Sequence, residues 1–167
     1  MYQSFDSMPT HARLWIYQAN RTFNTVEKEQ LFNGLKDLCE QWSAHGTPLR
    51  TSFTIQFDQF VIMAVDEKVN GASGCSIDGS VRYLKSLQDQ LGIDFFDRTC
   101  VAFLKEGKII VHPIVEIRNL FESYALLAET VTFNNTLTNK AEWEKHWRVP
   151  VKESWLARYL PKTAVAD

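Results

Sequence analysis

A stripe of apolar residues at helical spacing predicts the first long helix of this chain, over about 25–45. Its members are Val26, Leu31, Phe32, Leu35, Leu38, Cys39 and Trp42. Asn24 is a favoured N-cap residue, and Glu27 three positions later completes a capping box. Gly46 and Pro48 follow the last apolar position, so we expect the helix to end just before them.

The pattern then changes to the period of a strand. Phe53, Ile55 and Phe57 alternate with polar residues, which predicts a strand with one buried face. The next run, 60–65, is apolar on both faces, as in a central strand. Upstream, residues 14–17 predict a short apolar strand.

The remaining elements follow from the same two periods. We predict a helix over 79–91, a hairpin of 100–105 and 108–114, a helix over 116–128, a strand over 131–137, and short helices over 140–147 and 152–160. The first six elements have the order βαββαβ of the ferredoxin-like sandwich. The predicted class is therefore α+β: a mostly antiparallel sheet with helices on one face, continued by a C-terminal β/α extension.

Composition predicts one globular domain. The chain has 167 residues, of which 45% are apolar, enough for a single core. We expect one domain over 1–167, with 1–12 as a loose lead-in and 115–167 as an extension packed on the core. The sequence leaves a homo-oligomer open.

Charge and cysteine content narrow the class of protein. A net charge of −2 argues against a nucleic-acid binder. No apolar run approaches the roughly 20 residues of a membrane span, and the N-terminus lacks the pattern of a secretory signal. The three cysteines are odd in number and widely spaced, which is typical of reduced thiols. The predicted location is cytoplasmic.

A segment rich in small residues, 71–80, is the first candidate for chemistry. It precedes the predicted helix over 79–91, where small side chains allow close approach and a helix start offers free N–H groups. The predicted ligand is a small anion, and the binding residues would be Ser73, Gly74, Cys75, Ser76, Asp78 and Ser80. The structural alternative is that Ser76 or Asp78 caps the helix and Cys75 is simply buried.

A cysteine-dependent enzyme is the alternative function. Cys75 lies near a helix start, which lowers a thiol pKa, and His45 or His112 would supply the base. The favoured structural alternative for His45 is a histidine that bonds the last carbonyls of the first helix. No phosphate loop, dinucleotide pattern or metal-ligand spacing occurs, so we expect no ATPase activity, no cofactor and no metal.

Aromatic residues near the C-terminus are the third candidate. Trp143 and Trp147 lie four apart on one predicted helical face, and Trp155 follows with Arg158. Trp and Arg dominate binding hot spots, so these four residues predict a surface for a protein partner. The structural alternative is that the tryptophans are core anchors.

Three blocks of the sequence resemble one protein family. They are 42–46 (Trp-Ser-Ala-His-Gly), 73–78 (Ser-Gly-Cys-Ser-Ile-Asp) and 154–160, which contains Ser154-Trp155 and Arg158-Tyr159-Leu160. Together they look like a family of small uncharacterised bacterial proteins sometimes labelled ABC transporter ATPases. The resemblance covers most of the chain but implies no active site. With no complete catalytic set, we expect a ligand-binding or interaction module.

Overall fold

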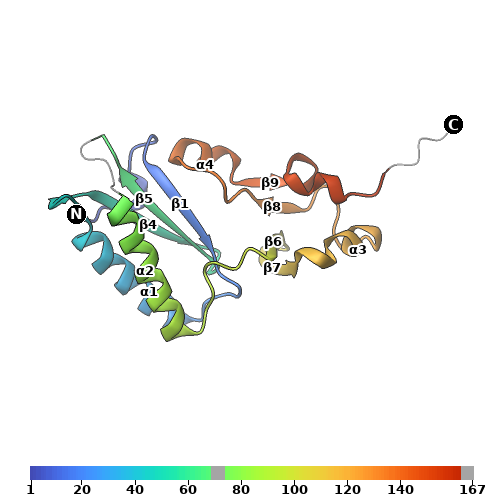
Figure 1. The fold of residues 1–167 in the computed structure, drawn as a ribbon. Coiled ribbons are helices and arrows are strands. Elements are labelled where there is room, and N and C mark those ends of the chain that lie inside the picture. Colours follow the sequence, from blue (N-terminus) through green and yellow to red (C-terminus); the bar gives the residue numbers. More distant parts are fainter. Residues whose placement is uncertain (69–73, 163–167) are drawn as a thin grey trace. The chain divides into compact units, whose positions relative to one another are not determined.

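The computed structural model describes residues 1–68 and 74–162, with the backbone alone at 74–76. The chain forms two compact units. Unit 1 comprises Met1–Asp97 and Asn135–Lys145, and unit 2 comprises Arg98–Asn134 and His146–Asp167. Figure 1 shows their elements in chain order. The unit boundary falls at residue 98, before the predicted start of the extension at 115, and the prediction of one domain stays a prediction.

Unit 1 is built on a three-stranded antiparallel sheet. Its strands are β1 (Arg13–Gln18), β4 (Arg50–Gln56) and β5 (Phe60–Asp66), in the order β1-β5-β4. All seven residues of β5 are buried, which agrees with the prediction of a central strand. The β4–β5 turn places Phe57 and Asp58 at positive φ, 52° and 50°, a backbone conformation that usually favours glycine.

Two helices, α1 (Thr25–Gln41) and α2 (Gly74–Leu91), cover one face of this sheet (Figure 1). The core between them and the strands includes Leu31, Leu35, Phe53, Met63 and Leu84. The other face carries the 3-10 turn η1 (Phe5–Ser7) and α4 (Lys140–His146), which are joined by an edge-on contact of Phe5 with Trp143 at 5.3 Å. The sheet is therefore covered on both sides.

The start of α1 is as predicted, and its end is not. The Asn24 side chain accepts from the Glu27 amide, and the Glu27 carboxylate accepts from the Asn24 amide, which confirms the capping box. The helix ends at Gln41, short of the predicted 45, because Trp42 turns to an extended conformation. A small hairpin of β2 (Ser43–Ala44) and β3 (Thr47–Pro48) follows.

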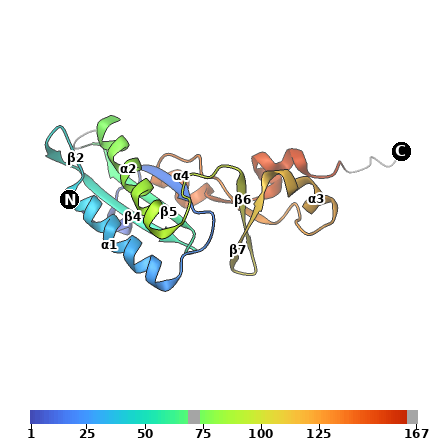
Figure 2. The same ribbon diagram turned by 60° about the horizontal axis from the view of Figure 1, so that its bottom comes forward.

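Unit 2 contains a second antiparallel sheet with strand order β7-β6-β8-β9. The strands are β6 (Cys100–Lys105), β7 (Lys108–Pro113), β8 (Val131–Phe133) and β9 (Arg148–Pro150), of which β9 was not predicted. Figure 2 shows β6, β7 and α3 (Ile117–Glu122), which is preceded by the turn η2 (Ile114–Glu116). The short helix predicted over 152–160 is two 3-10 turns, η3 (Val151–Glu153) and η4 (Trp155–Tyr159).

The predicted α+β class is confirmed at the level of helices and antiparallel sheets. The ferredoxin-like arrangement is not confirmed. The fourth strand of that prediction is β6, and β6 pairs with β7 and β8 instead of joining the sheet of unit 1. The predicted helix over 116–128 and strand over 131–137 are both shorter, at 117–122 and 131–133.

Candidate functional site

The small-residue segment does not have the predicted form where the structure describes it. The helix α2 begins at Gly74, five residues before the predicted start, so Ser76 and Asp78 lie inside it and neither is its N-cap. Ser80 is 3% exposed, and its hydroxyl donates to the Ile77 carbonyl at 2.7 Å. Ser80 is thus turned to its own helix. Ser73 and the side chains of 74–76 lie outside the described residues.

The residues proposed for cysteine chemistry belong to three different elements of the chain. His45 lies in the β2–β3 turn with φ 51° and is exposed, so it does not cap the first helix. His112 is a residue of β7 in unit 2, beside the Phe103 ring. Cys75 is in the first turn of α2, in unit 1. A nucleophilic role for Cys75 stays a prediction.

The four residues proposed for partner binding divide between the two units. Trp143 lies on α4 in unit 1, against Phe5. Trp147 is 4% exposed in unit 2 and packs on Phe133 at 4.8 Å between ring centroids, so it is a core residue and not part of a surface. Trp155 and Arg158 remain, and both are exposed on η4.

Trp155, Arg158, Tyr159 and Arg118 form one stacked cluster, which we call the aromatic–arginine surface. The Arg158 guanidinium lies 5.2 Å from the Trp155 ring centroid and 5.1 Å from that of Tyr159. Arg118 of α3 stacks on Tyr159 at 5.8 Å. Trp155 is 48% exposed. The surface therefore presents a half-exposed indole beside the Arg158 guanidinium, with the Arg118 guanidinium on the neighbouring Tyr159 ring.

Local structure explains why these side chains gather. The Ser154 hydroxyl accepts from the Leu156 amide at 3.1 Å and starts η4. Leu156 is fully buried and anchors the turn in the core of unit 2. Side chains three apart in a 3-10 turn eclipse, so Trp155 and Arg158 lie one above the other.

The two cations of the aromatic–arginine surface have no carboxylate partner among the described residues. Within the part of the chain that the structure describes, neither Arg118 nor Arg158 forms an ion pair or a hydrogen bond. By contrast, Arg13, Arg21 and Arg50 in unit 1 each pair with a carboxylate. Unit 2 also holds eight Lys and Arg against six Asp and Glu, whereas unit 1 holds ten against fourteen.

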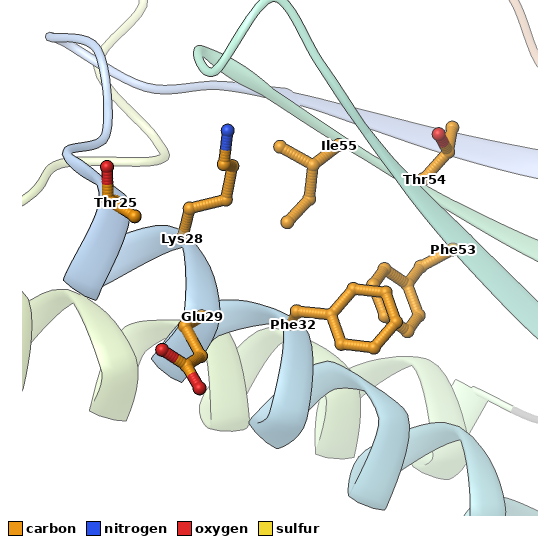
Figure 3. Close-up of a pocket in the computed structure, with 7 residues that line it drawn as sticks. All are labelled: Thr25, Lys28, Glu29, Phe32, Phe53, Thr54 and Ile55. Carbon is orange, nitrogen blue, oxygen red and sulfur yellow. The ribbon is translucent and has the colours of Figure 1, made fainter.

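A groove of about 500 Å³ lies between α1 and β4 in unit 1 (Figure 3). It is lined by Thr25, Lys28, Glu29, Phe32, Phe53, Thr54 and Ile55. Phe32 stacks edge-on against Phe53, with 5.2 Å between ring centroids. The floor of the groove is therefore aromatic and apolar.

Helical spacing predicts Phe32 as part of the core stripe of α1, so the sequence pattern does not predict the groove. In the structure Phe32 is 45% exposed and Val26 is 64% exposed, while Leu31, Leu35 and Cys39 fill the interior. Apolar spacing alone does not separate the residues of this helix that fill the interior from those that line the groove.

A buried carboxylate at the end of β5 forms a second polar cluster in unit 1. Asp66 lies 3.0 Å from His11 Nε2 and 3.5 Å from Arg50 Nη1, and it accepts from the Lys68 amide. Burial works to raise the pKa of Asp66, but the contacts with His11, Lys68 and Arg50 outweigh it and lower the pKa below its usual value. Among the described residues, the one side-chain hydrogen bond of His11 is its contact with Asp66.

Comparison with protein-family profiles, curated proteins and solved structures finds no match to this chain. The resemblance to a family of small bacterial proteins therefore stays a prediction. Over residues 1–68 and 74–162, no group of three or more His, Cys, Asp and Glu is placed to hold a metal ion. Among the helices described, none is long and apolar enough to cross a membrane.

Proposed function

We propose that this chain is an interaction module, and that the aromatic–arginine surface of unit 2 docks an acidic segment of a partner protein. The observation that carries the proposal is the pair of unpaired guanidiniums held over Trp155 and Tyr159. Trp, Tyr and Arg are the residues most enriched in binding hot spots. Two stacked cations beside a half-exposed indole match a partner that combines carboxylates with an apolar or aromatic residue.

The charge of the two units supports an acidic partner. Unit 2 carries an excess of basic residues although the whole chain is acidic, so attraction for a carboxylate is concentrated there. Single-stranded nucleic acid would also stack on Trp and Arg, but a nucleic-acid binder usually carries a much larger positive charge than this chain. The favoured partner is a protein segment.

The test is a fluorescence titration of the full chain with a labelled peptide in which glutamate alternates with leucine and tryptophan. Arg158→Glu should weaken binding at least about tenfold, because it removes a cation and adds a repelling carboxylate. Lys108→Glu is the matched control: it makes the same change of charge in unit 2, at the β6–β7 turn, outside the surface. Equal losses in both variants, or no binding by the parent chain, would refute the proposal. Stronger binding of an oligonucleotide of equal charge would assign the surface to nucleic acid.

A further inference from the structure

The outer edge of β4 is only partly covered. Tyr2 pairs with Thr51 as a short parallel bridge, through the bonds Thr51 N to Met1 O and Gln3 N to Thr51 O. Because the N–H and C=O groups of alternate strand residues point to the same side, those of Phe53 and Ile55 also face this outer edge. The groups of Ser52, Thr54 and Gln56 face β5 instead.

The cover ends at Gln3. Its carbonyl, which would be next in the ladder, accepts from the Ser52 hydroxyl at 2.7 Å. Among the described residues, no backbone or side-chain group bonds to the outward N–H and C=O of Phe53 and Ile55. Among the described residues, two backbone N–H donors and two C=O acceptors are thus left without a partner. Their spacing along β4 is the spacing with which a further strand would pair.

This open edge borders the groove. The side chains of Phe53 and Ile55 line it from β4, and those of Phe32 and Lys28 line it from α1 (Figure 3). A strand added to the edge would place every second side chain on the face that α1 covers. Backbone pairing and an apolar slot therefore coincide, which is the combination used in recognition by strand addition.

Antiparallel pairing with the β4 strand of a second copy conflicts with this cover. If two copies paired through β4 in antiparallel fashion about Thr54, residue 57 of the second copy would fall opposite Thr51. That place is already held by Tyr2. An extended segment of another protein has no such constraint, because it can turn away where the N-terminal residues begin.

Two charged residues at the rim of the groove, Lys28 and Glu29, restrict the charge of a segment that could bind there. The Lys28 ammonium is 2.9 Å from Asp58 and is neutralised by it. Glu29 is exposed and forms no ion pair within the described part of the chain. A segment without acidic residues, flanked by a basic one, is the best electrostatic match.

We propose that β4 binds an extended, apolar segment of another protein as an added strand, paired to the backbone of Phe53 and Ile55 and with one apolar side chain in the groove. This site lies in unit 1 and does not depend on the aromatic–arginine surface of unit 2.

The experiment titrates ¹⁵N-labelled full chain with a short peptide in which valine and threonine alternate between two terminal lysines. The amide signals of Phe53 and Ile55 should show the largest shifts and slower exchange with solvent. The same peptide with every amide methylated keeps its side chains but cannot pair, so it should not bind. Binding of both peptides, or of neither, would overturn the proposal.

Variants of the protein test the contribution of backbone pairing separately from the contribution of the groove. Ile55→Pro removes an outward N–H while leaving the β4–β5 pairs of Thr54 and Gln56, and proline is tolerated on such an edge. It should weaken peptide binding about tenfold. If that variant fails to fold, Phe32→Ala replaces it, with the same loss expected. Val26→Ala is the matched control, because Val26 is an exposed apolar residue of α1 outside the groove. A loss in Val26→Ala equal to that in Phe32→Ala would refute the groove as the binding site.

Discussion

Gly34 lies inside α1 where that helix meets α2, and its replacement by alanine tests how tightly the two helices pack. A Cβ added at Gly34 would overlap the Tyr83 Oη atom and lie 3.4 Å from Tyr83 Cζ and 3.7 Å from Leu87 Cδ2. Glycine to alanine inside a helix usually stabilises by about 1 kcal/mol, whereas forcing extra atoms into a packed contact costs about 1–3 kcal/mol. We therefore expect Gly34→Ala to lower the free energy of unfolding by up to about 2 kcal/mol.

The sign of the effect should reverse when the phenol oxygen is removed. In Tyr83→Phe the nearest remaining atoms to the added Cβ are at ordinary or slightly tight contact distances, 3.4 and 3.7 Å. Gly34→Ala should then raise the free energy of unfolding by about 1 kcal/mol, as helix propensity predicts. Gly79 is the control, because it lies in α2 with nothing within 4 Å of an added Cβ. Gly79→Ala should stabilise by about the same amount in both backgrounds.

The assay is urea denaturation followed by circular dichroism, applied to the four members of the Gly34/Tyr83 cycle. A coupling free energy of about 1–3 kcal/mol is expected between the two positions. If Gly34→Ala is as stabilising beside tyrosine as beside phenylalanine, the ring moves aside without cost. The Tyr83 hydroxyl would then not limit the packing of α1 against α2 at Gly34.

Two ionisable groups give the remaining predictions. Hydrogen bonds from Arg21 and from the Asn24 amide lower the pKa of Glu27 to about 2, so its stabilising effect is present above its ordinary pKa of 4.5 and is lost as the pH falls towards 2. Arg21→Ala should raise the pKa measured by NMR titration of the Glu27 carboxylate, and an unchanged pKa would contradict this. Burial raises the pKa of Cys39 to about 12, so iodoacetamide at about pH 8 should modify it only after unfolding. Modification of Cys39 in the native chain, detected by mass spectrometry, would show that this thiol is not buried.

Local interactions account for the parts of the fold that sequence reasoning predicted. The capping box at Asn24 and Glu27 depends on residues three apart, and the β6–β7 hairpin depends on the turn at Glu106 and Gly107, both at positive φ. Such features involve only neighbours in the chain, so a sequence pattern contains all the information they need.

Long-range contacts decided the parts that it did not predict. The period of β6 indicates a strand but not its neighbour, and the structure pairs it with β8 through Phe103 and Thr132. Helix α1 ends at Gln41 because the Trp42 carbonyl accepts from the Leu49 amide at 3.0 Å, which begins the hairpin. The turn at Phe57 and Asp58 contains no glycine, so its positive φ values could not be predicted from the sequence. None of these partners can be read from periodicity.

The candidate surfaces also contain some residues that the sequence predicts and others that depend on long-range contacts. Trp155 and Arg158 were predicted because Trp and Arg are enriched in interfaces, and a 3-10 turn places them together. Arg118 was not, because its contact with Tyr159 joins α3 to η4 across a gap of forty-one positions in the sequence. The groove depends on α1 and β4, and exposure at Phe32 is a property of their packing.

The edges of the two sheets differ in a way that bears on strand addition. Proteins usually protect exposed edge strands with charged residues, prolines or a covering segment. In unit 2 the edge strand β7 begins at Lys108 and ends at Pro113, and β9 contains Arg148 and Pro150. In unit 1 the edge strand β1 is covered where Arg13 bridges Asn139. Between Ser52 and Gln56, β4 has no charged residue and no proline, and no segment of the described chain covers it, although residues 1–3 close the same edge immediately beside it. If exposure of this stretch had no function, a single lysine at position 54 would protect the edge against unwanted pairing with other chains. Such a lysine would cost β4 little stability. The edge strand β1 also has no charge and no proline from Leu14 to Gln18, so it is the groove beside β4 that favours β4 as the binding edge.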